Sequence, residues 1–220
     1  MRQTGLSYPE LRVLYADASL LVLDKPAGLL SVPGRGADKQ DCLSARAQRR
    51  YPDALVVHRL DMATSGLMVM ARGLPAQRAL SRAFASRTVS KRYLAIVDGH
   101  PAPPPEGWGV IDLPIGVDWP NRPRRVIDRQ LGKPSMTRWR LLSHEKPGHS
   151  SRLELEPVTG RSHQLRVHLL ALGHPILGDA LYASPRVAAL TQRLLLHACS
   201  IELPHPDTAE PMRFTCTAEF

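Results

Sequence analysis

The chain of 220 residues lacks several features that define common classes of protein. Its three cysteines, Cys42, Cys199 and Cys216, cannot all pair with one another, and none belongs to a CxxC motif. Such cysteine usage is typical of a reducing compartment. The N-terminus has no signal-peptide pattern, and no apolar run approaches membrane-spanning length. We therefore expect a cytoplasmic protein that does not insert into a membrane.

Patterns of metal, nucleotide and hydrolytic sites are missing as well. The sequence has no phosphate-cradling glycine loop and no GxSxG nucleophile elbow. His163 and His168 are five residues apart, which places them on different faces of a helix, and no cysteine or carboxylate cluster joins them. We predict no metal site and interpret His58, His163, His168 and His197 as hydrogen-bonding residues in the core or around a site.

Acidic residues are few relative to basic ones, 20 against 29, and the resulting net charge of +9 gives a pI near 10.0. A positive excess of this size suits a polyanionic partner such as RNA. Surplus arginine also occurs as a solvated face, so charge alone leaves both interpretations open. The basic residues cluster in the segments 46–50, 78–92 and 122–129.

The most informative stretch is HRLDMATSG at residues 58–66, which sets Asp61 near Arg59 between two apolar segments. Val56-Val57 and residues 67–71 have the pattern of buried strands, so Asp61 lies on a short turn between rigid elements. A buried carboxylate there needs a partner, because an unpaired buried charge costs several kcal/mol. Taken alone, the stretch favours a turn-capping aspartate over a catalytic one.

A second stretch, TGRSHQLRVH at residues 159–168, changes that interpretation. The two stretches together resemble the RluA-type pseudouridine synthases, a resemblance that extends over the chain from about Leu14 to Phe220. The LDKPAG run at residues 23–28, the KRY run at 91–93 and the LLHA run at 195–198 are similar to further motifs of that family. Ala63 is a departure, since close relatives have an acidic residue there.

The resemblance implies an enzyme that isomerises uridine in RNA to its C5-glycoside, a reaction that needs no cofactor. It implies that Asp61 is the catalytic carboxylate, that Arg161 is its ion-pair partner, and that Arg59 helps to displace the target base. Tyr93 is expected to stack on the flipped base, while Leu196 and His197 line the floor of the pocket. Packing in the core is the alternative for these last three residues.

The resemblance also implies the fold class, α+β, with a mixed, largely antiparallel sheet flanked by helices and an active-site cleft along the sheet. Periodicity is compatible with it: residues 41–50 and 75–87 have helical patterns, the second with Arg78 and Arg82 away from its apolar face. Residues 162–172 form the clearest helix, with Arg161, Gln164 and His168 on a polar face that we expect to point away from the core.

The segment 119–134 is basic, rich in proline and poor in regular periodicity, which is typical of a functional or disordered loop. It could stack on bases and contact phosphates, or it could be a solvated arm. We predict an RNA-contact set in this segment, the 75–87 helix and the 162–172 helix, namely Arg78, Arg82, Trp119, Asn121, Arg122, Arg124, Arg125, Gln164 and Arg166.

Residues 118–123 and 173–179 look most like the dual-specificity members of the family. This subgroup resemblance implies loop uridines of large-subunit (23S) ribosomal RNA and of tRNA anticodon stem-loops as substrates. Residues 1–220 are expected to form a single catalytic domain, without an N-terminal RNA-binding domain of S4 type, and to be a monomer. A passive RNA-binding protein would share the basic loops, and a metal-dependent nuclease would need clustered carboxylates, whereas the acidic residues here are scattered.

Overall fold

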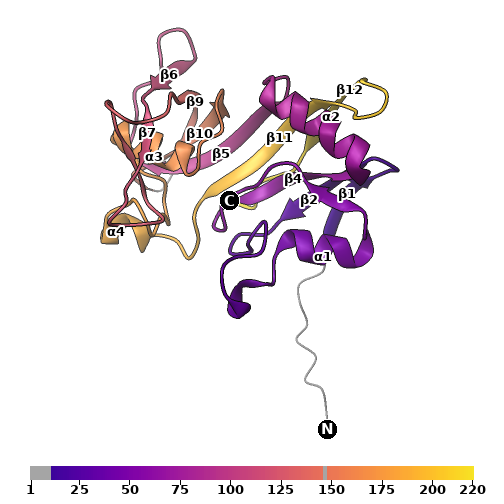
Figure 1. Cartoon of the computed structure of the whole chain (residues 1–220). Coiled ribbons are helices and arrows are strands. Elements are labelled where there is room, and N and C mark those ends of the chain that lie inside the picture. The colour runs from indigo at the N-terminus through magenta and orange to yellow at the C-terminus, as the bar shows by residue number, and fades with distance from the viewer. Residues whose placement is uncertain (1–10, 146–147) are drawn as a thin grey trace.

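The computed structural model describes residues 11–145 and 148–220 and is built on a ten-stranded mixed sheet (Figure 1). The central path runs β1-β2-β4-β11-β5-β10-β9-β6, with β3 paired to β4 and β12 paired to β11. The strands are β1 (Arg12–Ala16), β2 (Leu20–Lys25), β3 (Ala54–Val56), β4 (Ser65–Arg72), β5 (Ser90–Asp98), β6 (Gly109–Asp112), β7 (Ile115–Val117), β8 (Arg125–Ile127), β9 (Met136–Glu145), β10 (Ser150–Pro157), β11 (Leu196–Pro204) and β12 (Pro211–Thr215).

The helices are few and short beside this sheet. They are a 3₁₀ turn at Ala37–Lys39, α1 (Leu43–Arg50), α2 (Gly73–Ala85), α3 (Gln164–Ala171) and α4 (Pro185–Ala188). The pair β4–β11 is parallel and the other described strand pairs are antiparallel. The predicted fold class, α+β with a mixed and largely antiparallel sheet, is therefore confirmed.

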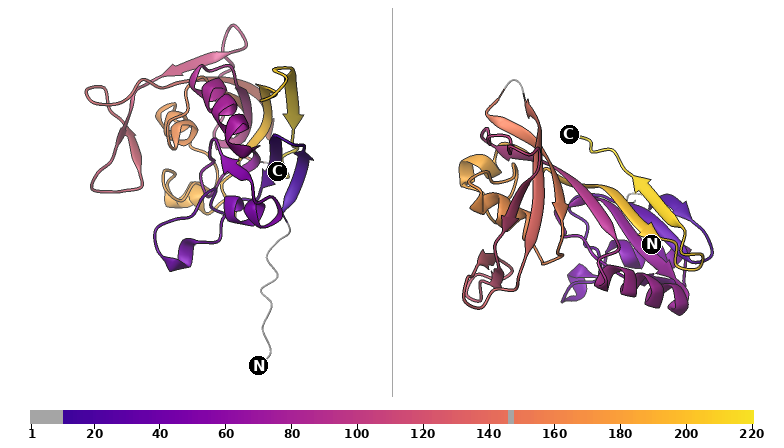
Figure 2. Two further views of the ribbon diagram at one scale, coloured as in Figure 1. Left: turned by 45° about the vertical axis from the view of Figure 1, so that its right-hand side comes forward. Right: turned by 90° about the horizontal axis from the view of Figure 1, so that it is seen from above.

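The long strands β5 and β11 carry the sheet across two lobes, which Figures 1 and 2 show as separate groups of elements. The first lobe contains β1 to β4, α1 and α2, and its core is built around residues 20–23 and 67–71. The second lobe contains β6 to β10, α3 and α4, and its core includes Leu153, Leu155 and Leu169. Tyr93 on β5 packs against both cores, so it marks the boundary between them.

Two expected elements differ in detail from the sequence prediction. The helix α1 begins at Leu43 with Cys42 as its N-cap, because the Cys42 sulfur accepts a hydrogen bond from the Ala45 N–H. Asp41, the first residue of the predicted 41–50 helix, lies before α1 and pairs with Arg46. The segment 119–134 is not wholly irregular, since its residues Arg125–Ile127 form β8 and pair with β7 in a two-stranded sheet.

The polar residues of α3 are buried, contrary to the prediction that they point away from the core. Gln164 and His168 are 3 % and 0 % exposed. His168 contacts the Thr137 hydroxyl at 2.9 Å through Nδ1 and the Leu113 carbonyl at 2.9 Å through Nε2. The polar side of α3 packs against the 113–137 segment, so its polar groups are paired inside the protein.

Gly66 allows the close approach of β4 and β11. Its φ is +105°, and a Cβ atom added there would lie 2.3 Å from the Ala198 carbonyl oxygen. Both the left-handed conformation and the lack of space require glycine at this position. Because Gly66 follows the Asp61 turn, this contact fixes the turn against the β11 backbone.

Candidate active site

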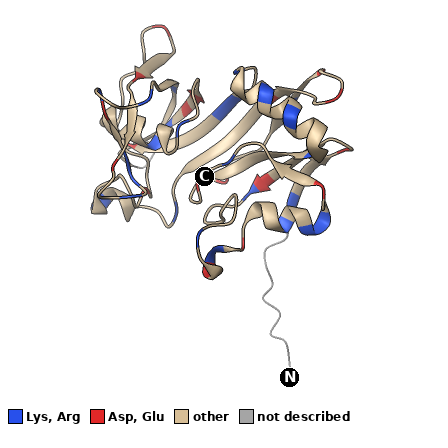
Figure 3. Cartoon of the chain, in the orientation of Figure 1, with Lys and Arg blue, Asp and Glu red and all other residues tan. Residues whose placement is uncertain are grey.

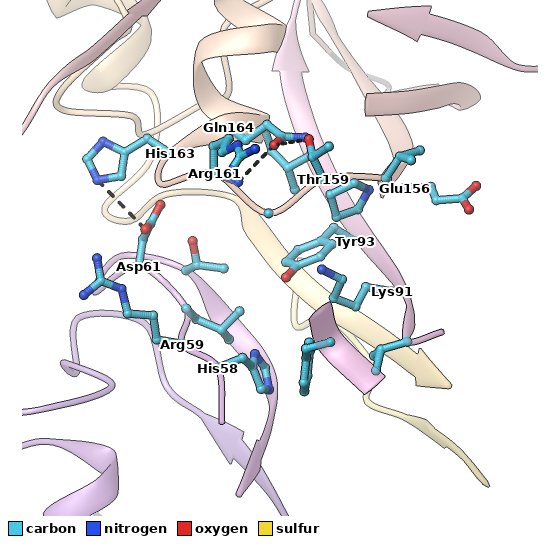
Figure 4. Close-up of a pocket in the computed structure, with 18 of the residues that line it drawn as sticks. His58, Arg59, Asp61, Lys91, Tyr93, Glu156, Thr159, Arg161, His163 and Gln164 are labelled. Carbon is cyan, nitrogen blue, oxygen red and sulfur yellow. Dashed lines mark hydrogen bonds and ion pairs between the residues drawn. The ribbon is translucent and has the colours of Figure 1, made fainter. Parts of the chain in front are cut away.

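A cavity of about 650 Å³ lies where the two lobes meet (Figure 4). The 57–64 segment of the first lobe and the 156–166 segment of the second line opposite sides of it, with Tyr93 and Leu196 from the central strands. The two motif stretches, about a hundred residues apart in sequence, are thus brought together by the sheet. The cavity contains Asp61, whose side chain is 25 % exposed.

A buried lysine stabilises the turn that carries Asp61. Lys25 is fully buried, and its Nζ donates hydrogen bonds to the carbonyl oxygens of Pro26, Leu29 and Met62 at 2.9, 2.8 and 3.0 Å. Burial lowers the pKa of Lys25 to about 8, although the negative charges of Asp61 and Asp24 oppose this shift. The three carbonyl contacts explain why β2 ends in a lysine: it joins the 25–29 loop to the residue after Asp61.

Arg166 provides the guanidinium that faces the Asp61 carboxylate. Its Nε and Nη2 donate to the two oxygens of the buried Asp179 carboxylate at 2.8 and 2.5 Å. The remaining terminal nitrogen, Nη1, lies 3.8 Å from Asp61 Oδ2. Because the bidentate contact with Asp179 locks the planar guanidinium, the position of Nη1 relative to Asp61 is fixed.

The predicted ion-pair partner of Asp61, Arg161, is therefore wrong. The Arg161 side chain is exposed, and its Nε donates to the Pro134 carbonyl at 3.4 Å. Both arginines line the cavity, but Arg161 precedes α3, whereas Arg166 lies inside the helix and faces Asp61. Arg166 was predicted to contact RNA; its side chain is 5 % exposed and faces two carboxylates, so a contact with a base inside the cavity stays a prediction.

Gln164 also has an internal structural role in place of the predicted RNA contact. Its Oε1 accepts from the Thr159 hydroxyl and from the Arg161 N–H at 2.7 and 3.0 Å. Its Nε2 donates to the Met136 carbonyl and to the Thr137 hydroxyl at 2.9 and 3.0 Å. With these four bonds the amide is fully used, so it orders the 159–161 turn at the rim of the cavity.

His163 is the second nitrogen group that faces Asp61. Its Nε2 lies 3.9 Å from Asp61 Oδ1, as the dashed line in Figure 4 marks. Burial is the largest cause that lowers the pKa of His163; Asp61 opposes the shift, and Arg166 and Arg125 add to it. The Asp61 carboxylate thus lies between a permanent cation at one oxygen and an imidazole at the other.

Tyr93 and Lys91 project from β5 into the same cavity (Figure 4). Burial raises the pKa of Tyr93, and the Asp61 charge adds to this effect, so the phenol stays protonated at neutral pH. Burial lowers the pKa of Lys91. Lys91 and Tyr93 are two residues apart on β5, and alternate residues of a strand face the same side, so both side chains reach the cavity.

Alternation also corrects one of the two residues predicted for the pocket floor. Leu196 lines the cavity, but His197, the next residue of β11, points to the other face of the sheet. There His197 is 4 % exposed; its Nδ1 contacts the Ser65 hydroxyl at 2.9 Å and its Nε2 the Cys216 carbonyl at 3.1 Å. The prediction that both residues line the floor is therefore wrong for His197.

Arg59 lies beside Asp61 at the open side of the cavity (Figure 4). Its side chain is exposed, and within residues 11–145 and 148–220 it has no hydrogen-bond or ion-pair partner. A guanidinium in this position is available to a bound molecule, so its role in base displacement stays a prediction.

The remaining predicted RNA-contact residues lie on two separated surfaces. Arg78 and Arg82 lie on the solvent side of α2, which Figure 3 shows among the basic segments of the first lobe. The others belong to the tip of the β7–β8 hairpin, where Trp119 is 67 % exposed with the Arg122 guanidinium 3.5 Å from its ring centroid. The hairpin set is Trp119, Asn121, Arg122, Arg124 and Arg125.

Sequence reasoning missed two buried residues that organise the site, Asp179 and Tyr182. Asp179 Oδ1 accepts from the N–H groups of Leu181 and Tyr182 at 3.0 and 3.2 Å, besides its bonds to Arg166. Asp179 belongs to the segment that resembles one subgroup, but its local sequence indicates no particular role. A buried arginine on α3 required a carboxylate, yet sequence alone does not pair residues 13 positions apart across a loop.

His58, at the start of the HRLD motif, is a neutral structural histidine. Its Nε2 accepts a hydrogen bond from the Val69 N–H at 2.9 Å, and its ring stacks on Phe84 with a centroid distance of 4.8 Å. Burial lowers the pKa of His58 to about 3, and the Lys91 charge adds to this shift. An imidazole whose Nε2 accepts a hydrogen bond must carry its proton on Nδ1.

We expect His58 to make the protein sensitive to acid. Between about pH 6.5 and 3 the unfolded chain binds a proton on His58 that the folded chain does not, so the free energy of unfolding falls as pH decreases through this window. His58→Gln keeps an acceptor for the Val69 N–H and removes the titration. Urea unfolding between about pH 7.5 and 4.5 should show a weaker pH dependence in this variant. An unchanged dependence would contradict the assignment.

Two structural observations concern whole classes of function. Among residues 11–145 and 148–220, no group of three or more histidine, cysteine, aspartate or glutamate residues is arranged to hold a metal ion. Within the same ranges, no helix is both long and apolar enough to cross a membrane.

Comparison with known proteins identifies the family. The family described as RNA pseudouridylate synthase matches residues 19–171. The dual-specificity RNA pseudouridine synthase RluA of Yersinia pestis is 49% identical over 208 residues, covering 94% of this chain and 99% of that protein. The protein of the same name from Escherichia coli K12 is 49% identical over 212 residues, covering 96% of this chain and 95% of that protein.

Solved structures agree with this result. The human RNA pseudouridylate synthase domain containing 1 has a TM-score of 0.77 and 30% identity, covering 94% of this chain and 83% of that one. The human domain containing 4 has a TM-score of 0.72 and 29% identity, covering 94% of this chain and 88% of that one. The chain therefore belongs to the RNA pseudouridine synthase family, a family of isomerases, and the predicted family and enzyme class are confirmed.

Proposed function

We propose that this enzyme isomerises loop uridines in both large-subunit ribosomal RNA and tRNA anticodon stem-loops, with Asp61 as the reacting carboxylate. The observation that carries the proposal is the Asp61 carboxylate in the cavity, with nitrogen groups 3.8 and 3.9 Å from its two oxygens. The dual substrate range is supported by relatives of nearly equal length that are named dual-specificity enzymes.

The reaction breaks the bond between N1 of uracil and C1′ of ribose, turns the base, and joins C5 to C1′. The proton on C5 moves to N1, so atoms and charge balance without a co-reactant. Asp61 serves either as a nucleophile at C6 or at C1′, or as a base at the sugar. Each of these routes needs an ionised carboxylate of fixed orientation, which Arg166 provides by directing one N–H at Oδ2.

A uridine stacked in RNA reaches Asp61 only after it flips out, at a cost of roughly a few kcal/mol that is smallest in loops. Arg59 is placed to fill the space that the base leaves, because it is exposed beside Asp61 at the cavity mouth. Tyr93 offers an aromatic face to the flipped uracil, and Leu196 an apolar wall. Lys91 is a further polar group at the same wall.

Substrate selection rests in this proposal on the α2 arginines and on the tip of the β7–β8 hairpin. Both surfaces are solvent-facing and basic, and Trp119 adds an aromatic group that suits unpaired bases. In this proposal the chain acts as one catalytic domain. A cytoplasmic location follows from the proposed substrates, which are cytoplasmic RNAs, and fits the three free cysteines.

We expect the purified enzyme to form pseudouridine in a tRNA anticodon stem-loop and in a ribosomal RNA hairpin with the same loop sequence. The binding affinity should fall steeply as salt rises, because arginines release counterions from the phosphates that they contact. Pseudouridine mapping after incubation measures the product, and filter binding from about 50 to 200 mM salt measures the affinity. A matched stem-loop whose target uridine is replaced by cytidine is the control. Modification of neither RNA would refute the substrate assignment and leave the family assignment intact.

A further inference from the structure

A buried hydrogen-bond chain runs from the β7–β8 hairpin to His163, whose imidazole faces the Asp61 carboxylate. Tyr182, which is 6 % exposed, lies between the hairpin and α3. Its hydroxyl accepts a hydrogen bond from the backbone N–H of Arg125 at 2.8 Å, and it lies 2.6 Å from Nδ1 of His163. His163 in turn presents Nε2 to Asp61 Oδ1. The chain therefore runs from the first residue of β8, through two side chains, to Asp61.

The proton positions along this chain follow from counting donors and acceptors. Because the Tyr182 oxygen accepts the Arg125 N–H, its own proton needs an acceptor, and among the described residues His163 Nδ1 is the atom in reach. An imidazole that accepts at Nδ1 while neutral carries its proton on Nε2. Nε2 is the nitrogen that faces Asp61, so Tyr182 makes His163 a neutral N–H donor aimed at the carboxylate.

The backbone of His163 has an unfavourable conformation in the arrangement that directs Nε2 at Asp61. His163 has φ +57° and ψ +16°, in the left-handed region, at the N-cap of α3. Such a conformation costs a residue other than glycine of order 1 kcal/mol or more and persists where the surroundings impose it. The Tyr182 ring contributes to these surroundings, because it packs edge-to-face on His163 at 5.6 Å and lies 4.9 Å from the Arg166 guanidinium carbon.

We propose that Tyr182 and His163 are a positioning pair that fixes the orientation of the Asp61 carboxylate and couples it to the seating of the β7–β8 hairpin on RNA. The inference rests on the proposed function, since it takes Asp61 as the reacting carboxylate. Arg166 Nη1 faces Oδ2 at 3.8 Å and His163 Nε2 faces Oδ1 at 3.9 Å, so the two nitrogen groups favour one rotation of the carboxylate. A neutral donor achieves this without adding a second positive charge that would weaken the nucleophile.

Substitutions at position 163 separate the two contacts of the imidazole. His163→Asn keeps a short amide near the position of Nδ1 and tolerates the left-handed backbone, but it does not reach Asp61. His163→Gln is longer, and its amide nitrogen takes the place of Nε2. We expect His163→Asn to lower the single-turnover rate of pseudouridine formation at least about tenfold, and His163→Gln to recover most of that loss.

Tyr182→Phe removes only the hydroxyl and keeps the ring that packs on Arg166. We expect a loss of about tenfold in the single-turnover rate with the dissociation constant for RNA changed less than about twofold. Tyr15→Phe is the matched control, because it also removes a hydrogen-bonded hydroxyl, that of Tyr15 to Asp17, on the edge strand β1. This control should retain the wild-type rate.

The tautomer of His163 can be measured without any RNA, by NMR of the ring nitrogens in protein that contains ¹⁵N-labelled histidine. The wild-type spectrum should show His163 as the Nε2–H tautomer, and Tyr182→Phe should shift it toward a mixture of tautomers. An Nδ1–H tautomer in the wild type would overturn the proposal. Rates of Tyr182→Phe and His163→Asn within about twofold of wild type, or an equal loss of RNA affinity and turnover, would overturn it too. Failure of the proposed function itself is detected separately, as activity that survives in Asp61→Asn.

Discussion

Asp61→Asn is expected to abolish pseudouridine formation while RNA binding survives. The amide has nearly the shape of the carboxylate, but it is neither a nucleophile nor a base of useful strength, so the step that all three routes require is lost. Loss of a nucleophile that the reaction cannot replace lowers turnover by more than about a thousandfold. Single-turnover product formation on the anticodon stem-loop measures the effect.

The same preparation provides the control for Asp61→Asn. Its dissociation constant for the stem-loop should stay within about threefold of wild type, because the exposed arginines that contact phosphates are unchanged. Asp61 is partly exposed and lies on a turn whose fixing contacts come from Lys25 and Gly66, so its substitution should leave the unfolding midpoint nearly unchanged. Activity above about a tenth of wild type would reject Asp61 as the reacting carboxylate.

Arg166→Lys is the second substitution with a large expected effect. The guanidinium serves two carboxylates at once, with Nε and Nη2 on Asp179 and Nη1 toward Asp61. A lysine ammonium is a point charge on a flexible stem, so it can satisfy the buried Asp179 but not hold Asp61 in addition. We expect the single-turnover rate to fall on the order of a hundredfold and the RNA affinity to change little.

Lysine is the informative replacement because it keeps the charge that the core requires. Arg166→Met would leave the buried Asp179 without a cationic partner, which costs about 3–5 kcal/mol and confounds turnover with unfolding. Arg161→Lys is the matched control, since Arg161 lines the same cavity from an exposed position. We expect it to keep nearly the wild-type rate on bound RNA. A greater loss of turnover in Arg161→Lys than in Arg166→Lys would show that Arg161 orients Asp61 after all.

Local sequence pattern and residue chemistry were sufficient to predict the helices and strands whose burial depends on residues near one another in the sequence. The amphipathic helix predicted for residues 75–87 is confirmed as α2, Gly73–Ala85, with Ala76 and Leu80 buried and Arg78 and Arg82 on its other side. The strands on both sides of the Asp61 turn are confirmed, because a run of apolar residues next to a polar turn has few other ways to be buried. Strand alternation is also a local pattern, and applied to β11 it would have separated Leu196 from His197, which the prediction placed on the same floor.

The sequence by itself determined the family, the carboxylate at residue 61 on its turn and the basic surfaces, because these are written in contiguous motifs and in composition. Only the tertiary structure decided which arginine faces Asp61, that the polar groups of α3 are buried, and that Asp179 and Tyr182 belong to the site. The physical reason is that a helix has two candidate arginines near its start, and only packing decides which one is buried. Arg166 is buried because it pairs with the carboxylate of Asp179, 13 residues further along the chain, and a contact of this kind produces no periodic pattern in the sequence.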